Sequence, residues 1–151
     1  MLTEKEKTIQ LGKVLLREGY AVKLTVGGTS MFPSVRSRQV VKVIPADPRN
    51  LFAGDIVVFE RGGQLIAHRL ISLNKMQHTF ITKGDFTIRR DPVLCEEDIL
   101  GKIDAIYRGN KLISLDRPIH KIKGRLMARI TRIMPPVVWL VSHLKRWRYS
   151  K

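Results

Sequence analysis

Short apolar runs separated by turn signals fill the middle of the chain and limit the folds open to it. Their lengths suit strands and are too short for buried helices. Gly62-Gly63 lies between two runs and Gly109-Asn110 between another two, and both pairs are typical of tight hairpin turns. The pattern predicts a mainly β fold, an antiparallel barrel or sandwich, and argues against a βαβ fold. The runs cover residues 40–44, 56–59, 65–71, 79–82, 99–107 and 112–115.

A short helix is expected before the strands. Thr3 and Glu6 have the spacing of a capping box, in which each side chain serves the other residue's backbone N–H. Apolar residues then recur at helical spacing until Gly19, which predicts a helix over 4–18. From Tyr20 the apolar residues alternate, so a half-buried strand is expected next. The apolar residues of the predicted helix are Leu11, Val14 and Leu15.

The C-terminal part returns to helical spacing and carries most of the charge. The 151 residues include 28 Lys and Arg and 13 Asp and Glu, a net charge of +15. Ten of the basic residues and none of the acidic ones lie in 117–151, so residues 1–116 carry only +5. We therefore divide the chain into a domain of residues 1–116 and a basic helical appendage of residues 117–151.

The appendage is expected to form amphipathic helices. Apolar residues step by four, four and three along one face, a basic residue precedes each, and Pro135-Pro136 must break or kink the helix. Trp139 and Trp147 lie beyond the prolines, among further basic residues. The apolar stripe is Ile122, Leu126, Ile130 and Ile133, and the basic residues are Lys121, Arg125, Arg129 and Arg132.

Three binding surfaces fit this appendage: an anionic membrane, the domain of the same chain, and nucleic acid. A basic amphipathic helix with Trp near its end is typical of a segment in the interface of an anionic membrane. Alternatively, Leu126, Ile130 and Ile133 dock on the domain and leave a solvated basic face. A basic stripe is also the electrostatic footprint of nucleic-acid binding. Met and Val beside the tryptophans favour lipid or protein contact, so nucleic acid ranks last.

Neither a secretory signal nor a membrane span is expected. The first residues mix charges and lack an apolar core before Leu11. The longest uncharged apolar run, 133–141, is far shorter than the roughly 20 residues that a spanning helix needs. Cys95 is the only cysteine, which rules out an internal disulfide and a Cys-based zinc cluster. We expect a cytoplasmic protein, or one peripheral at the cytoplasmic face of a membrane.

Ser30 and His68 are the first candidates for chemistry. A serine hydroxyl needs a neighbouring base to become a nucleophile, and small residues before it let a substrate approach. Taken alone, Gly27-Gly28-Thr29-Ser30 equally describes a turn. His68 lies in an otherwise apolar strand; it suits a general base if its ring faces Ser30 and is otherwise a core histidine. Weaker candidates in polar or basic contexts are His78, His120 and His143.

Asp85 and Asp91 are candidates for a third group. A carboxylate on the far imidazole nitrogen would fix the tautomer of the histidine and stabilise the imidazolium. Each aspartate could equally form an Asx-turn or pair with an arginine. The residues alone leave both aspartates open. The neighbouring arginines are Arg69, Arg89 and Arg90.

In combination these residues resemble the type I signal peptidase family. The resemblance covers roughly residues 20–106, where 101–103 is similar to the family's final strand. A histidine at the base position resembles the archaeal and endoplasmic-reticulum branch, whereas common bacterial members and the related repressor-type self-cleaving peptidases use lysine there. The motifs are Gly28-x-Ser30-Met31-x-Pro33, Gly54-Asp55-Ile56-Val57-Val58-Phe59, His68-Arg69, and Lys83-Gly84-Asp85 with Asp91.

The resemblance implies a serine endopeptidase on a signal-peptidase-like β fold, with no metal and no cofactor. It gives Ser30 the role of nucleophile and His68 that of general base. Asp91 matches the orienting acid and Asp85 the family's other important aspartate, so we prefer Asp91 to Asp85 as the orienting acid. The Ser30 N–H would line the oxyanion hole, and Gly28 stands where lysine-type enzymes often have a second donor. The family cleaves after small side chains, with the substrate strand added to a sheet edge. Other oxyanion or substrate-strand candidates are Thr29 and Met31.

Family members usually carry an N-terminal membrane anchor, which the first twenty residues do not provide. The expected substrate is therefore a leader or precursor peptide in the cytoplasm or at the membrane surface. One alternative is a catalytically silent module on the same fold that binds membrane or nucleic acid. A second is a self-cleaving repressor-type peptidase, although no Ala-Gly or Cys-Gly pair precedes Ser30.

Overall fold

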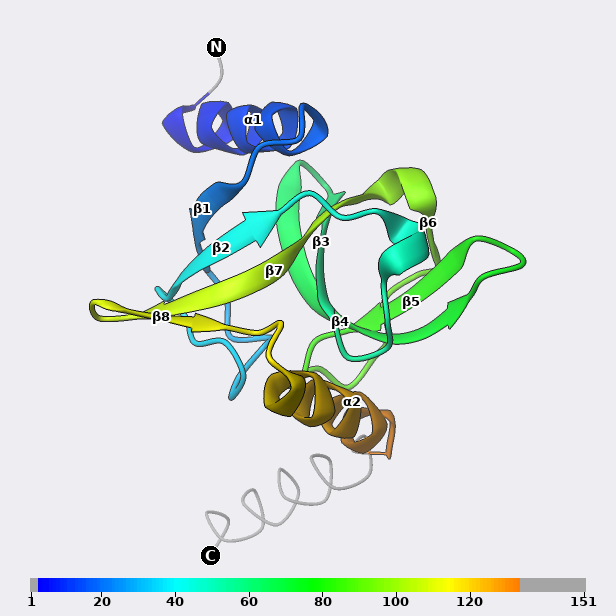
Figure 1. Cartoon of the computed structure of the whole chain (residues 1–151). Helices are drawn as coiled ribbons and strands as arrows, with labels where there is room; N and C mark the ends of the chain where they lie inside the picture. Colours follow the sequence, from blue (N-terminus) through cyan, green and yellow to red (C-terminus); the bar gives the residue numbers. More distant parts are fainter. Residues whose placement is uncertain (1–2, 134–151) are drawn as a thin grey trace, which may run out of the picture.

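The computed structural model describes residues 3–133 (Figure 1). The predicted break at Pro135-Pro136 and the segment with Trp139 and Trp147 lie outside these residues. No helix within 3–133 is long and apolar enough to cross a membrane. The elements are α1 (Glu4–Arg17), β1 (Val22–Thr25), β2 (Val40–Ile44), η1 (Pro48–Asn50), β3 (Ile56–Arg61), β4 (Gln64–Asn74), β5 (Thr79–Lys83), β6 (Leu94–Cys95), η2 (Glu96–Asp98), β7 (Ile99–Arg108), β8 (Lys111–Ser114) and α2 (Pro118–Ile133).

The predicted mainly β, antiparallel fold is confirmed. The strands form one sheet in the order β1-β2-β7-β3-β4-β5-β6, and β8 pairs with β7. β7 is central, with β2 along one edge and β3 and β8 along the other. The sheet does not close into a barrel. Every predicted apolar run contains a strand, and only the two-residue β6 had no pattern that predicted it.

Both predicted hairpin turns are present. Gly62 and Gly63 join β3 to β4 with φ of 58° and 72°, and Gly109 begins the β7–β8 turn with φ of 56°. These left-handed angles suit glycine, which has no Cβ to clash with the following carbonyl. The turns fix the register of the long strand pairs, including β3 with β4, which carries the candidate base His68.

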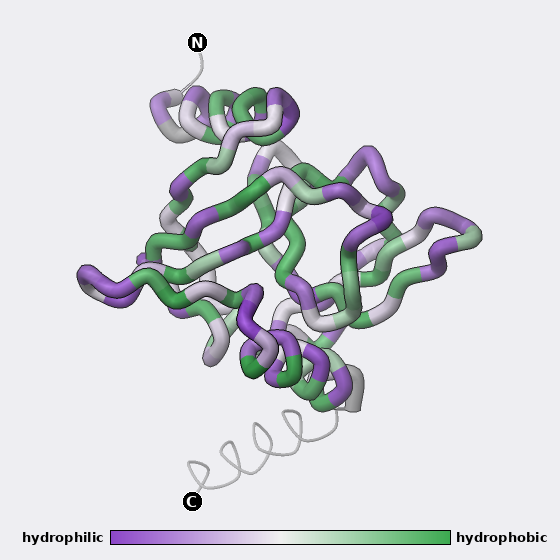
Figure 2. Tube along the Cα trace, viewed as in Figure 1, coloured by the Kyte–Doolittle hydropathy of each residue, from purple (hydrophilic) through white to green (hydrophobic). Residues whose placement is uncertain are grey.

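The sheet has a hydrophobic core on each of its faces. Successive side chains of a strand point to opposite faces, and β3 is buried on both. Ile56 and Val58 contribute to the core under α1, and Val57 and Phe59 contribute to the core around Leu70. In Figure 2 hydrophobic residues occupy much of the strands, while the tip of the β7–β8 hairpin is hydrophilic. The double core explains why the run at 56–59 is uninterrupted rather than alternating.

α1 begins at the predicted capping box and packs on the first core. The Thr3 amide donates to the Glu6 carboxylate at 2.7 Å, and the Glu6 amide donates to Thr3 Oγ1 at 3.3 Å. Leu16 is fully buried in this core. The expected apolar face is wrong in part, because Leu11 and Val14 are exposed. The buried Gly12 faces the sheet instead, where a Cβ would lie 3.7 Å from Leu65 and 3.8 Å from Leu24.

α2 docks on the domain through small residues. Gly124, Ala128 and Thr131 are buried and recur at helical spacing. The backbones of Gly124 and Gly54 touch: a Cβ on Gly124 would lie 2.8 Å from the Gly54 carbonyl oxygen. Gly54 has φ of 107°, so no other residue fits there without strain. Docking therefore depends on two facing glycines.

The alternative that Leu126, Ile130 and Ile133 dock on the domain is wrong for Leu126 and Ile130, because both are exposed. Ile122 of the same predicted stripe is exposed as well. A bulky side chain on the docking face would hold the helix too far away for the backbone contact at Gly124. The small-residue face therefore packs inward, and Ile122, Leu126 and Ile130 point away from the domain.

Lys83, at the end of β5, is buried and donates from Nζ to the Thr131 carbonyl at 2.6 Å. The bond satisfies a carbonyl near the C-terminal end of α2, where helix carbonyls lack intrahelical donors. Burial lowers the pKa of Lys83; the charge of Asp85 opposes this shift and that of Arg90 adds to it. α2 is therefore joined to β5 by a buried cation.

Lys83→Met is expected to alter the pH dependence of stability. Because the folded-state pKa of Lys83 is lowered, the unfolded chain binds this proton more tightly, and the free energy of unfolding rises with pH between the two pKa values. The free energy of unfolding of wild type minus that of Lys83→Met, measured by urea titration, should increase as the pH rises towards about 10. The exposed Lys123→Met controls for the loss of one lysine charge. A constant difference for Lys83→Met contradicts the prediction.

Candidate active site

Ser30, His68 and Asp91 come together from three separate segments. Ser30 lies in the loop after β1, His68 lies in β4, and Asp91 lies in the loop after β5. His68 Nε2 is 3.0 Å from Ser30 Oγ, and His68 Nδ1 is 2.6 Å from Asp91 Oδ2. The three groups form one hydrogen-bonded chain with the histidine in the middle.

The Ser30 loop is braced by the loop after β5. The Ser30 carbonyl accepts from the Phe86 amide at 2.8 Å. A Cβ on Gly84 would lie 2.7 Å from the Ser30 carbonyl oxygen and 3.1 Å from Ser30 Cβ. Only a residue without a side chain allows this approach, which accounts for the glycine in Lys83-Gly84-Asp85. Phe32 and Phe86 meet edge-to-face beside Ser30, with ring centroids 6.1 Å apart.

The Asp91 carboxylate is held by three side chains. Besides His68, it accepts from Thr82 Oγ1 at 2.7 Å and from Arg61 Nη1 at 2.9 Å. Burial alone would raise the pKa of Asp91, but the hydrogen bonds from His68, Thr82 and Arg61 outweigh burial and lower it. Asp91 is therefore a carboxylate at neutral pH, and it accepts hydrogen bonds only.

This charge state fixes the tautomer of His68. Since the Asp91 carboxylate can only accept, the short contact requires a proton on His68 Nδ1. The neutral ring then has its lone pair on Nε2, which faces the Ser30 hydroxyl. The His68 side chain is 12 % exposed, and its ring meets that of Phe59 edge-to-face. The arrangement presents a base to Ser30 in an orientation held from two sides.

Asp85 does not contact His68. Its two carboxylate oxygens accept from Nε and Nη2 of Arg69, both at 2.7 Å, and both side chains are buried. Arg69 also donates to the Gly54 carbonyl at 2.7 Å and to Ser34 Oγ at 2.9 Å. Of the two aspartates that the residues alone left open, Asp91 reaches the histidine and Asp85 forms the arginine pair.

Ser30 and His68 line a cavity of about 670 Å³, here called the Ser30 cleft. β1 and the first half of β4 form its walls, and Thr8 and Ile9 of α1 lie at its border. Of the flanking candidates, Gly28 and Met31 line the cleft, with Met31 also buried in the core, whereas Thr29 is exposed and outside the lining.

Two free strand edges face the Ser30 cleft. Within residues 3–133, β1 pairs only with β2. β4 pairs with β3 from Gln64 to Arg69, whereas its pairing with β5 begins only at Arg69. The backbone of β4 just before and at His68 therefore has one unpaired edge, and so does β1. Such edges are templates for a further extended strand.

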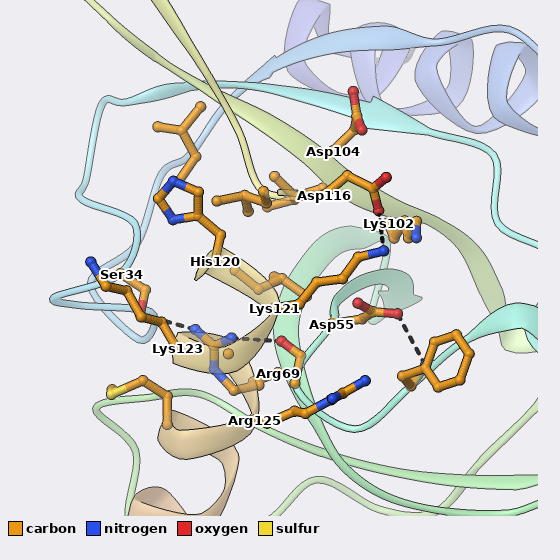
Figure 3. A pocket seen from close by; sticks show the side chains of 18 of the residues that line it. Ser34, Asp55, Arg69, Lys102, Asp104, Asp116, His120, Lys121, Lys123 and Arg125 are labelled. Carbon is orange, nitrogen blue, oxygen red and sulfur yellow. Dashed lines mark hydrogen bonds and ion pairs between the residues drawn. The ribbon is translucent and has the colours of Figure 1, made fainter. Parts of the chain in front are cut away.

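A second cavity, of about 460 Å³, lies between α2 and the sheet (Figure 3). Arg69 forms part of its wall, and Figure 3 shows its guanidinium beside Ser34. Lys121 points to Asp116, with the charged atoms 2.8 Å apart. Ser30, His68 and Asp91 are not among its lining residues, so it is separate from the hydrogen-bonded chain.

The other histidines lie apart from Ser30. His78 is exposed and contacts Glu96 at 2.6 Å, His120 lines the second cavity, and His143 lies outside the described residues. Within residues 3–133, no group of three or more His, Cys, Asp or Glu side chains is placed to hold a metal ion.

Sequence reasoning missed two residues that hold Asp91, namely Thr82 and Arg61. Thr82 is buried two residues after Phe80 on β5, and the alternation of a strand places both side chains on one face. A threonine on the apolar face of a predicted strand is the sequence signal that could have identified it. Arg61 ends β3 next to the turn, and nothing in the local pattern distinguishes it from a solvated arginine.

Gly84→Ala should displace Ser30. The added methyl group would meet backbone and side-chain atoms of Ser30, so the loop after β1 must move. We expect a loss of stability of about 1–3 kcal/mol, measured by urea titration, because overpacking forces such shifts. Gly27→Ala is the matched control, since a Cβ there meets nothing within 4 Å. Equal stability of the two variants would contradict the close approach of Gly84 to Ser30.

Comparison with curated proteins and with solved structures finds no match. Comparison with family models finds one: residues 1–88 match the family described as Peptidase S24-like. The matched region contains the helix, the first strands, Ser30 and His68. The fold and the match agree on a peptidase fold of the kind that the resemblance implied, and the chain belongs to the Peptidase S24-like family.

Proposed function

We propose that the chain is a serine endopeptidase of the signal-peptidase type, which cleaves a leader or precursor peptide. The observation that carries the proposal is the hydrogen-bonded chain of Ser30, His68 and Asp91 at a cleft with two free strand edges. Family membership supports peptidase chemistry in general. The histidine and its carboxylate support the histidine-dependent form of that chemistry.

The geometry supports a role for each residue. Ser30 Oγ attacks the peptide carbonyl while His68 Nε2, 3.0 Å away, takes the hydroxyl proton. The same nitrogen then returns the proton to the leaving amine. Asp91 stays ionised, holds the Nδ1–H tautomer and stabilises the imidazolium that forms between these steps.

The Ser30 amide is suited to stabilise the oxyanion. Among the described residues no acceptor is found for this N–H. A backbone amide on the nucleophile lies close to the carbon under attack and gains strength as negative charge develops there. Gly28, which also lines the cleft, carries no side chain that would obstruct the approach of the substrate.

The substrate is proposed to bind as an extended strand. β1 and the first half of β4 offer unpaired backbone groups along the Ser30 cleft. Main-chain hydrogen bonds to these edges would hold a peptide across Ser30 with little dependence on its sequence. Specificity would then come from the side chains that line the cleft, among them Leu65.

A panel of small-residue-containing peptides tests the proposal. Ser30→Ala and His68→Ala should abolish cleavage, because the nucleophile and the base are lost. Asp91→Asn should lower kcat by about 10⁴-fold, since the wrong histidine tautomer is then favoured. Cleavage is measured by mass spectrometry of the products, and circular dichroism checks that each variant folds.

Two further variants make the result specific. His78→Ala removes an exposed histidine with a carboxylate contact of the same 2.6 Å length and should cleave as wild type does. Asp85→Asn should lower the midpoint of thermal unfolding, because it breaks the buried pair with Arg69. Cleavage by Ser30→Ala at the wild-type rate would refute the proposal. Shortening of the incubated chain in wild type but not in Ser30→Ala would instead identify self-cleavage.

A further inference from the structure

The outer face of α2 carries exposed apolar side chains on a helix whose other face is already docked. We call Ile119, Ile122, Leu126 and Ile130 the outer stripe; their exposed fractions are 58 %, 63 %, 55 % and 40 %. They step by three, four and four and therefore lie along one side of the helix. Large exposed apolar patches on soluble proteins mark surfaces that bind something else.

The outer stripe cannot turn inward. α2 is fixed by the backbone contact between Gly124 and Gly54 and by the bond from Lys83 to the Thr131 carbonyl. Rotating the helix to bury Leu126 would break both contacts. The stripe is thus held outward by the docking face, whereas an isolated amphipathic helix could bury its apolar side on the domain.

The charges around the stripe favour an anionic surface. α2 contains no Asp or Glu. Helical spacing places Lys123 along one border of the stripe and Arg125 and Arg129 along the other. All three are exposed, and within residues 3–133 none of them forms an ion pair. Figure 3 shows Lys123 and Arg125 extending to opposite sides of the helix.

α1 shows that exposed apolar residues on a helix are not always accompanied by a purely basic surface. Leu11 and Val14 are 59 % and 55 % exposed, much like Ile122 and Leu126. However, the α1 region also carries Glu4, Glu6 and Glu18 among its basic residues. Of the two α-helices within residues 3–133, α2 is the one that combines an outward apolar face with cations and no acidic residue.

We propose that the outer stripe and its bordering cations bind the surface of an anionic lipid bilayer, with α2 lying in the plane of the interface. The apolar side chains enter the boundary between headgroups and acyl chains, while the long basic side chains reach the headgroup phosphates. Because α2 is docked rigidly, the bilayer would set the orientation of the whole domain. The proposal goes beyond the peptidase function and does not depend on it.

Vesicle sedimentation tests the proposal with the full chain in the Ser30→Ala background, so that peptidase activity plays no part. Binding should be strong on phosphatidylcholine vesicles that contain phosphatidylserine, weak on phosphatidylcholine alone, and reduced by salt. The double variant Ile122→Ser/Leu126→Ser should lose about tenfold or more in partition coefficient, because two apolar side chains no longer leave water.

The matched control is Leu11→Ser/Val14→Ser, which removes equally exposed side chains from α1 and should bind as the parent does. Both double variants should keep the parent's unfolding midpoint, because all four side chains are exposed.

Unchanged vesicle binding by Ile122→Ser/Leu126→Ser would overturn the proposal, as would equal binding to uncharged vesicles. Loss of a dimer in this variant, seen by sedimentation velocity and without vesicle binding by the parent, would assign the stripe to a second copy of the chain and also overturn it. Each of these outcomes leaves the peptidase assay untouched, so the two proposals fail separately.

Discussion

The buried guanidinium of Arg69 joins the loop of Ser30, the loop after β5 and the segment that contacts α2. It belongs to β4 directly after His68, pairs with Asp85 in the loop after β5, and donates to Ser34 in the loop that follows Ser30. Its remaining bond, to the Gly54 carbonyl, holds the segment on which α2 docks. Removing one partner of such a buried pair leaves an uncompensated charge, which costs about 3–5 kcal/mol.

The two buried carboxylates are kept apart by this division of partners. Asp85 has both oxygens occupied by one arginine, whereas Asp91 shares its oxygens among His68, Thr82 and Arg61. In the first arrangement both oxygens are paired with one guanidinium, whose charge does not change. The second includes a group that gains and loses a proton. Asp85 therefore fixes the position of Arg69, whereas Asp91 provides a negative charge beside the His68 ring. Both residues lie in the loop after β5.

The strands and turns could be predicted because local rules determine them. Apolar runs of strand length and glycines at left-handed angles mark β3, β4 and the turn at Gly62 without reference to the rest of the fold. The residues of the hydrogen-bonded chain were also predictable, because their types and order resemble a family. The residues alone did not show which aspartate meets His68, because a contact between β4 and the loop after β5 depends on register; only the resemblance favoured Asp91.

The faces of the helices could not be read from periodicity. Spacing shows that Leu126 and Ile130 share a side of α2, but not that this side is left outward. The decisive residues, Gly124 and Gly54, carry no hydrophobic signal and act through the close approach of two backbones. In α1 likewise, the buried residue is Gly12 and the neighbouring Leu11 is exposed. Packing of small residues is a property of two surfaces together, and a single segment does not reveal it.

The bond between Lys83 and the Thr131 carbonyl links α2 mechanically to the end of β5. Thr131 belongs to the last turn of α2, and the residue after Lys83 is the glycine packed against Ser30. A displacement of the last turn of α2 would therefore act, through the Lys83 side chain, on the backbone that braces Ser30. The positions of α2 and of the Ser30 loop are therefore coupled through Lys83 and Gly84.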